Sequence, residues 1–247
     1  MISRSTRGEV ICLFDENGLS AKDWLEDGYD VYCYDLVHTM ASITWNGNTS
    51  HGKLIKMPWD ATDDDANQAI IDRHQGRAVM VLAFPPCTDL AVSGAAWFES
   101  KRKKNPNFQI DALHLALTAK TIGESLRVPY AIENPVSVLS TLWRKPNYTF
   151  HPYEYGGYLP FNDVHPLFPE YIAPRDAYTK KTCYWTGGGF IMPLPKPVDK
   201  PEGYSTQHLK LGGKSAKTKR IRSASPRGIA KAIYLANRGK RVISSNP

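Results

Sequence analysis

The chain has 247 residues, of which 42% are hydrophobic and 22% charged, and a formal net charge of +7 at pH 7. This length and balance fit one large α/β domain with at most a small appendage, and they exclude global disorder. No apolar run reaches the roughly 18 residues that a membrane-spanning helix needs, so we expect no membrane partner.

Strand-like and helix-like segments alternate over the first 135 residues. The residue patterns predict these elements in chain order: strands over 9–14, 29–36, 77–84 and 128–135, and helices over 60–74 and 107–126. A loop rich in small polar residues covers 44–53. Such alternation is typical of a doubly wound, mostly parallel sheet, so we expect a Rossmann-like α/β fold.

The pattern changes after residue 143. Prolines and aromatic residues dominate 145–175 with little periodicity, and a further strand is predicted over 180–188. The segment 225–239 reads as a helix, with Ser225 as its cap, Pro226 in the first turn and Gly239 as its end. We therefore expect a core over 1–185, a small irregular basic region over 186–223, and a helix with a tail over 224–247.

Two basic runs stand out. Residues 210–222, KLGGKSAKTKRIR, carry six basic side chains and no acid, and KRKK occupies 101–104. Each run taken alone is as consistent with an ordinary solvated surface as with a binding site. If the fold brings both near one site, binding of a polyanion becomes the better interpretation, although charge alone does not distinguish DNA from RNA.

The four cysteines, Cys12, Cys33, Cys87 and Cys183, are scattered and form no CxxC pair. This pattern favours reduced thiols and predicts no structural zinc or other metal site. Residues 1–8 are polar and basic and are not followed by the long apolar region of a secretion signal, so we expect a cytoplasmic protein rather than a secreted one. Cys12, Cys33 and Cys183 lie in strand patterns and are expected to be core residues.

Polar residues follow several predicted strands, where ligands bind in open α/β sheets. Asp35 comes 17 residues after Gly18, close to the spacing at which an acid receives a ribose hydroxyl. A plain turn and a surface aspartate are the alternative. Asp60 follows a short extended segment and fits either an adenine amino group or a helix cap.

The segment FPPCTDL, residues 84–90, places Cys87 directly after a buried strand and two prolines. Such stiffening suits a nucleophile, because attack geometry is lost with small displacements. Glu133 ends another strand, and a carboxylate beside a thiol raises the thiol pKa. We therefore assign Glu133 to the substrate: a protonated carboxyl can hold a ring nitrogen while a thiolate adds to the adjacent ring carbon.

FPPCT at 84–88, followed by AIENP at 131–135, resembles the Pro-Cys and Glu-Asn motifs of the DNA (cytosine-5)-methyltransferases. PPCTDLAVSGAAWF, HPYEYG and TKKTCYW look most like the compact phage-encoded branch, and the resemblance spans about 10–236. It implies a class I S-adenosylmethionine-dependent methyltransferase fold, with 186–223 as a small target-recognition region. It also implies double-stranded DNA as substrate, a monomer, and the host cytoplasm as location.

The resemblance implies three catalytic roles. Cys87 adds to C6 of a flipped cytosine, Glu133 holds N3 and the exocyclic amine, and Lys180 is the supporting cation. Other matched positions would hold the cofactor S-adenosylmethionine: Phe14, Asp15, Gly18, Asp35 on the ribose, Asp60 near the adenine, and Pro85. The remainder would contact DNA or shape the loop: Thr88, Asn134, Lys217, Lys219, Arg220 and Arg222.

The sequence departs from the family pattern at several positions. Thr88 replaces a usual glutamine, Pro135 a valine and Thr182 an arginine, and the glycine-rich cofactor turn is reduced to Gly18. Three alternatives stay open: a non-catalytic DNA-binding protein on this scaffold, the same chemistry on RNA or a free nucleotide, and a Cys-His hydrolase. The last lacks a histidine near Cys87 in sequence.

Overall fold

A computed structural model describes residues 6–44, 50–200, 202–203, 206–212 and 215–239. Its centre is an eight-stranded sheet in the order β3-β4-β2-β1-β5-β6-β8-β7. The strands are β1 (Glu9–Leu13), β2 (Asp30–Asp35), β3 (Ser42–Thr44), β4 (Leu54–Pro58), β5 (Ala78–Ala83), β6 (Tyr130–Pro135), β7 (Tyr148–Phe150) and β8 (Thr182–Gly187). The α-helices are α1 (Lys22–Glu26), α2 (Asp64–His74), α3 (Phe98–Lys104), α4 (Phe108–Leu126), α5 (Leu139–Leu142), α6 (Thr206–Lys210), α7 (Ala216–Ser223) and α8 (Arg227–Asn237).

The sheet is mixed. Its five neighbouring strands β4, β2, β1, β5 and β6 are parallel. β3 pairs antiparallel at one edge, and β8 and β7 are antiparallel to their neighbours at the other. The predicted α/β class is therefore confirmed, and the expected mostly parallel sheet is confirmed in part: its centre is parallel and its two edges are antiparallel.

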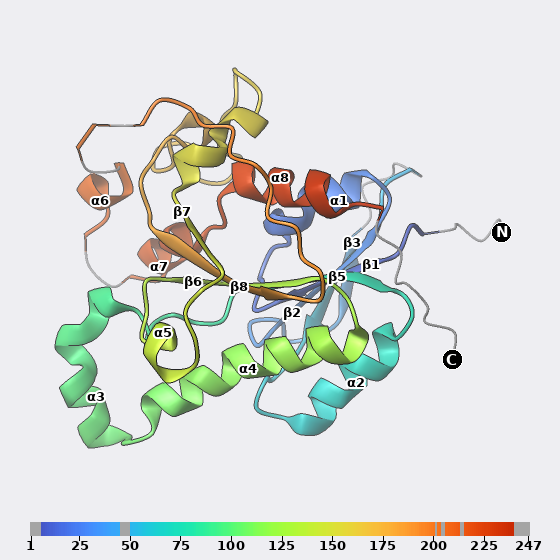
Figure 1. Ribbon diagram of the computed structural model, residues 1–247, viewed down its shortest axis with the longest axis horizontal. Helices are drawn as coiled ribbons and strands as arrows, with labels where there is room; N and C mark the ends of the chain where they lie inside the picture. The colour runs from blue at the N-terminus through green and yellow to red at the C-terminus, as the bar shows by residue number, and fades with distance from the viewer. Residues whose placement is uncertain (1–5, 45–49, 201, 204–205, 213–214, 240–247) are drawn as a thin grey trace.

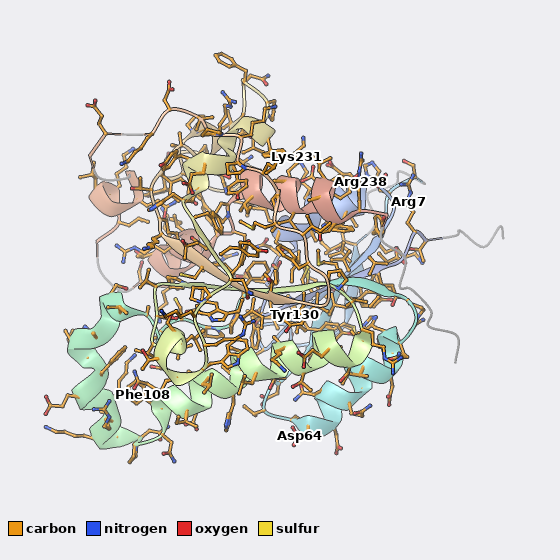
Figure 2. All side chains as sticks on the ribbon, in the orientation of Figure 1. Arg7, Asp64, Phe108, Tyr130, Lys231 and Arg238 are labelled. Carbon is orange, nitrogen blue, oxygen red and sulfur yellow. The ribbon has the colours of Figure 1, made fainter. Side chains whose placement is uncertain are left out.

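Helices cover both faces of the sheet. Figure 1 shows α1 and α8 on one face and α2, α4 and α5 on the other. β1 reads EVICL with every residue buried, as expected for a parallel strand covered on both faces. Side chains fill the two spaces between sheet and helices (Figure 2) and form two separate apolar clusters.

The winding of the chain brings the predicted site residues to one end of the sheet. From β1 the chain moves outward through β2 and β4, and β5 then returns beside β1 before β6 continues the other way. Ligands bind in open α/β sheets at this change of direction, outside the carboxyl ends of the strands. Because β8 is antiparallel, with Thr182 paired to Pro135, its first residues also lie at that end.

Most predicted elements are confirmed to within a few residues, but the start of α2 is not. The sequence pattern predicts a helix from residue 60, whereas α2 begins at Asp64. Asp63 is the cap, accepting hydrogen bonds from the backbone N–H groups of Asp65 and Ala66. Asp60 instead accepts from the backbone and hydroxyl of Thr62, so its interpretation as a helix cap is wrong.

The start of α8 also differs from the prediction. Pro226 occupies the cap position and Ser225 makes no capping bond, so Ser225 as cap is wrong. The buried carboxylate of Asp176 accepts from the backbone N–H of Gly228 at 2.7 Å instead. A long-range contact thus replaces the local cap, and it ties the helix to the segment that leads to Lys180.

Several elements have no counterpart in the sequence prediction. β3 and β7 are three residues each, too short for a visible alternation. The region 186–223, predicted to be irregular, contains α6 and α7. Part of the predicted loop over 44–53, Lys214 of the basic run and the tail 240–247 lie outside the described residues.

The structure places the four cysteines. Cys12, Cys33 and Cys183 are buried, which confirms them as core residues, whereas Cys87 is exposed. Within the described ranges, no helix is both long enough and apolar enough to cross a membrane.

Candidate active site

The loop after β5 holds Cys87 rigidly at the carboxyl end of the sheet. The backbone N–H of Phe84 donates to Leu13 O at 3.0 Å, which joins the loop to β1. Cys87 O accepts from the N–H groups of Leu90 and Ala91 at 3.1 and 2.8 Å. The thiol is therefore presented to solvent from a chain segment that is fixed on both sides.

Asn134 connects the two motifs that the sequence singled out. Its side-chain N–H donates to Pro85 O at 3.1 Å, so the Glu-Asn strand end is bonded to the Pro-Cys loop. Asn134 is 1% exposed, and its Oδ1 has no hydrogen-bond partner among the described residues. A buried acceptor needs a donor, so we expect an ordered water or a bound molecule to supply one.

Glu133 lies on β6 beside this loop and is buried, at 8% exposure. Burial raises the pKa of its carboxyl, and Lys180 opposes that shift. Its register partner Tyr184 is also buried, and the Tyr184 pKa is raised by burial and then by Glu133. A carboxyl in these surroundings keeps its proton to higher pH, as a donor to a ring nitrogen requires.

Lys180 brings a positive charge to this site. It precedes β8, and its Nζ donates to Arg222 O at 3.0 Å. Although Cys87 is exposed at the surface, the surrounding protein partly desolvates its thiol and raises the thiol pKa; Glu133 raises this pKa further and Lys180 lowers it. The fold thus brings Cys87, Glu133 and Lys180 within electrostatic range of one another, from segments far apart in sequence.

This arrangement predicts how Cys87 reacts with a simple thiol reagent. Glu133→Gln removes a charge that raises the Cys87 pKa, so iodoacetamide should label Cys87 about threefold to tenfold faster at pH 8. Lys180→Met should slow labelling by a similar factor. Rates are measured by mass spectrometry of the Cys87 peptide.

The control for this experiment is Glu99→Gln in α3, since Glu99 is exposed and pairs with Lys103. Its labelling rate should equal that of the unmodified protein. Equal rates in all three variants would show that Glu133 and Lys180 do not control the thiol.

The turn after β1 is built by its own side chains. Asp15 is buried and accepts from the N–H groups of Asn17 and Gly18, at 2.9 and 2.8 Å, and from the Ser20 hydroxyl at 2.7 Å. Gly18 has φ 72°, and a Cβ there would lie 2.8 Å from Leu54. The Asp15 carboxylate and a single glycine therefore shape a turn that families with glycine-rich loops build differently.

Phe14 and Asp35 lie around the same turn. Phe14 has a strained φ of 58° and its ring lies 4.8 Å from that of Trp59. Asp35 ends β2, accepts from the N–H of Val37 at 2.9 Å, and is half-buried. Burial raises the Asp35 pKa, with smaller contributions from Asp15 and Glu16. These carboxylates therefore lie near one another.

Asp60 is also at this end of the sheet, two residues after β4. It is fully exposed, and its hydrogen bonds with Thr62 lower its pKa. The Asp60 carboxylate is thus ionised and accessible to a ligand. Its contact with the adenine of a cofactor stays a prediction.

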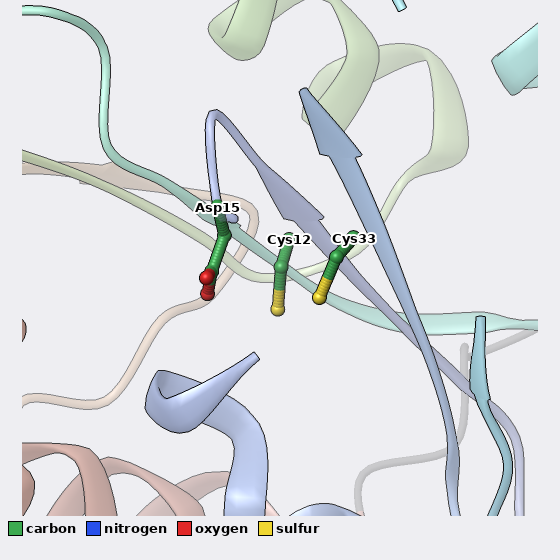
Figure 3. Close-up of side chains that lie close together, drawn as sticks. All are labelled: Cys12, Asp15 and Cys33. Atoms are coloured by element: carbon green, nitrogen blue, oxygen red, sulfur yellow. The ribbon is translucent and has the colours of Figure 1, made fainter. Parts of the chain in front are cut away.

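One cluster was not foreseen from the cysteine spacing. Cys12 and Cys33 are partners on neighbouring parallel strands, and Asp15 follows on the next turn. Figure 3 shows the three side chains close together, and their ligand atoms lie within 4.8 Å of one another. Because Asp15 already accepts three hydrogen bonds within the turn, we interpret the cluster as support for the turn.

Basic residues flank the site on two helices. Figure 1 shows α3, α6 and α7 around the left end of the sheet, where the parallel strands finish. In α3, Lys101 donates to Asp89 at 2.6 Å and to Thr88 O at 2.7 Å, which fixes the segment after Cys87. Both basic runs therefore contribute a helix at this end of the sheet in that view, and binding of a polyanion stays a prediction.

The four cations assigned to α7 differ in their contacts. Lys217 lies 5.0 Å from the Tyr171 ring, and Lys219 is exposed. Arg222 donates to Leu211 O at 2.9 Å. Arg220 forms an ion pair with Glu16 at 2.8 Å, a contact with the turn after β1 that no local sequence signal indicated.

No protein-family model matches the chain, and no curated protein matches it.

Proposed function

We propose that this protein transfers a methyl group from S-adenosylmethionine to C5 of cytosine in DNA. The observation that carries the proposal is the convergence of Cys87, Glu133 and Lys180 at the carboxyl end of the sheet, beside the change of direction between β1 and β5. A nucleophile, a protonated acid and a cation are the groups that activation of a pyrimidine ring requires.

Cys87 would add to C6 of the cytosine while Glu133 gives its proton to N3, which makes C5 nucleophilic. After C5 has taken the methyl group, a water molecule would accept the C5 proton and the Cys87 thiolate would be eliminated. The N3 proton would then return to Glu133, which restores the aromatic ring and the starting state of the acid. Lys180 stabilises the thiolate, which burial and Glu133 otherwise disfavour. A stacked base cannot reach a thiol fixed in this loop, so the cytosine has to leave the helix at a cost of a few kcal/mol.

The turn after β1 and the end of β2 fit the cofactor. Asp35 offers a half-buried carboxylate where a ribose hydroxyl would bind, and the Phe14 and Trp59 rings offer an apolar surface. When bound, S-adenosylmethionine supplies an activated methyl group on its sulfonium. The Asp15 and Gly18 turn would orient the methionine part of the cofactor.

Methyl transfer is tested with S-adenosylmethionine that carries a labelled methyl group, offered with cytosine-containing duplex DNA. The label should be recovered as 5-methyldeoxycytidine after digestion, and a duplex of A·T pairs alone should stay unlabelled. Parallel reactions with RNA and with cytidine nucleotides test the alternative substrates. Label on adenine, or label on no substrate, would contradict the proposal.

DNA binding should depend on Lys217 and Lys219. Each phosphate contact contributes about 0.9 to the slope of log affinity against log salt, so Lys217→Ala with Lys219→Ala should flatten that slope by about 2. Fluorescence anisotropy of a labelled duplex at several salt concentrations measures the slope. Preference among DNA sequences should change little, because phosphate contacts carry no base information.

The matched control removes two lysines elsewhere, Lys22 in α1 and Lys120 in α4, each of which pairs with a glutamate one helical turn away. This variant has the same net charge as the α7 variant and should keep the original slope. If both variants showed the same loss, net charge rather than α7 would explain DNA binding.

A further inference from the structure

An ion pair joins the basic helix α7 to the turn after β1. Arg220 Nη2 lies 2.8 Å from Glu16 Oε1, across 204 residues of sequence. The side chains are 62% and 38% exposed, so both remain accessible to solvent and to ligands. The pair thus connects a proposed DNA-binding element with a proposed cofactor-binding element.

Glu16 belongs to a group of carboxylates around the cofactor turn. Asp15 is its neighbour, and the Asp35 pKa is raised by burial and further by both Asp15 and Glu16. Among these three side chains, Glu16 is the one that an arginine neutralises in an ion pair. A change at Arg220 therefore alters the net charge that a ligand at this turn experiences.

The helix α7 is held so that its charged side chains reach outward. Ser215 caps it by accepting from the Thr218 N–H at 3.1 Å, and Ile221 is fully buried against Tyr178 and Leu211. Lys219 is exposed beside Arg220. A phosphate bound at this helix would compete with Glu16 for the Arg220 guanidinium, which is suited to bidentate phosphate contacts.

The last turn of α7 also contacts the catalytic cation, since Arg222 O accepts from Lys180 Nζ at 3.0 Å. Arg220 and Arg222, two residues of one helix turn, therefore contact the turn after β1 and the reactive site respectively. DNA bound at α7 can therefore affect the groups that carry out the reaction, because the same helix turn contacts them.

We propose that the Arg220–Glu16 ion pair couples DNA binding to cofactor binding, an inference that rests on the proposed function. A DNA phosphate that takes Arg220 releases the Glu16 carboxylate, which then attracts the positively charged S-adenosylmethionine. The demethylated product S-adenosylhomocysteine lacks the sulfonium charge, so its affinity for the protein increases less when DNA binds. DNA thereby favours loading of the methyl donor over retention of the product.

The coupling is measured by calorimetric titration of the full chain with S-adenosylmethionine, with and without saturating duplex DNA. Because the ion pair is partly exposed, we expect the affinity for S-adenosylmethionine to rise by about threefold to fivefold when DNA is present. S-adenosylhomocysteine should show a smaller increase. By linkage, S-adenosylmethionine should strengthen DNA binding by the same factor as DNA strengthens cofactor binding.

Variants separate the ion pair from net charge. Arg220→Met should show the higher cofactor affinity without DNA and no further gain with DNA, whereas Glu16→Gln should show the lower affinity in both conditions. Lys120→Met removes the same charge in α4, where Lys120 pairs with Glu124, and should keep the DNA-induced gain. Saturation with DNA is verified by anisotropy for each variant.

Three results would overturn the coupling: no gain in the unmodified protein, a full gain in Arg220→Met, or an equal gain for the two cofactor forms. If S-adenosylmethionine or DNA failed to bind the unmodified protein at all, the proposed function would fail together with the coupling. Normal binding of both ligands with an unchanged response in Arg220→Met would remove the coupling alone.

Discussion

Replacing Cys87 with serine is expected to lower the rate of methyl transfer by at least about 10⁴-fold, because a hydroxyl at this position is a far weaker nucleophile toward C6. Cys87 lies on an exposed loop, so the substitution leaves both apolar clusters intact. The rate is measured as 5-methyldeoxycytidine formed under single-turnover conditions.

The matched control is Cys183→Ser, which alters a buried thiol on β8 at the same end of the sheet. This variant should methylate DNA at a rate within a few-fold of the unmodified protein once its folding has been verified. Cys87→Ser should still bind DNA and S-adenosylmethionine. Methyl transfer that persisted in Cys87→Ser would place the nucleophile elsewhere.

Glu133→Gln is expected to lower kcat by about 10²-fold or more, since the amide keeps the size of the side chain but cannot donate an acidic proton to N3. Burial raises the Glu133 pKa, so the protonated form that the reaction uses persists to higher pH and is lost as pH rises through that raised value. The fall in kcat caused by this ionisation should disappear in the variant. Steady-state rates over a pH series measure both effects.

DNA affinity should change little in Glu133→Gln, which separates a chemical role from a structural one. Glu124→Gln at the end of α4 is the control, because Glu124 is exposed and pairs with Lys120. A Glu133→Gln protein with near-normal kcat would show that this carboxyl only supports the fold.

Local patterns predicted the central elements of the fold because those elements carry strong signals. β1, β5 and β6 are nearly continuous buried runs, and α4 buries residues at helical spacing along its length. β3 has three exposed residues and α7 buries only Thr218 and Ile221, so neither shows a clear period. The cap of α2 was misplaced because Asp63, rather than Asp60, has the extended geometry that reaches the first N–H groups.

The sequence could predict those site residues that lie at the carboxyl ends of strands. Asp35 and Glu133 lie at or near the ends of β2 and β6, and Cys87 follows β5. These strands belong to the parallel centre of the sheet, where strands end together. Lys180 was proposed from the resemblance, and its place depends on the antiparallel β8. The Arg220–Glu16 pair had no local signal, because the fold alone brings residues so distant in sequence together.

Covalent capture on DNA containing 5-fluorocytosine tests the central claim most directly. The fluorine at C5 cannot leave as a proton, so addition of Cys87 to C6 followed by methyl transfer should leave a complex that survives denaturation. We expect one DNA strand per protein chain, only when S-adenosylmethionine is present, with the modified base attached to the Cys87 peptide by mass spectrometry. A protein that binds both ligands but forms no such complex, or forms it through another residue, would contradict the mechanism.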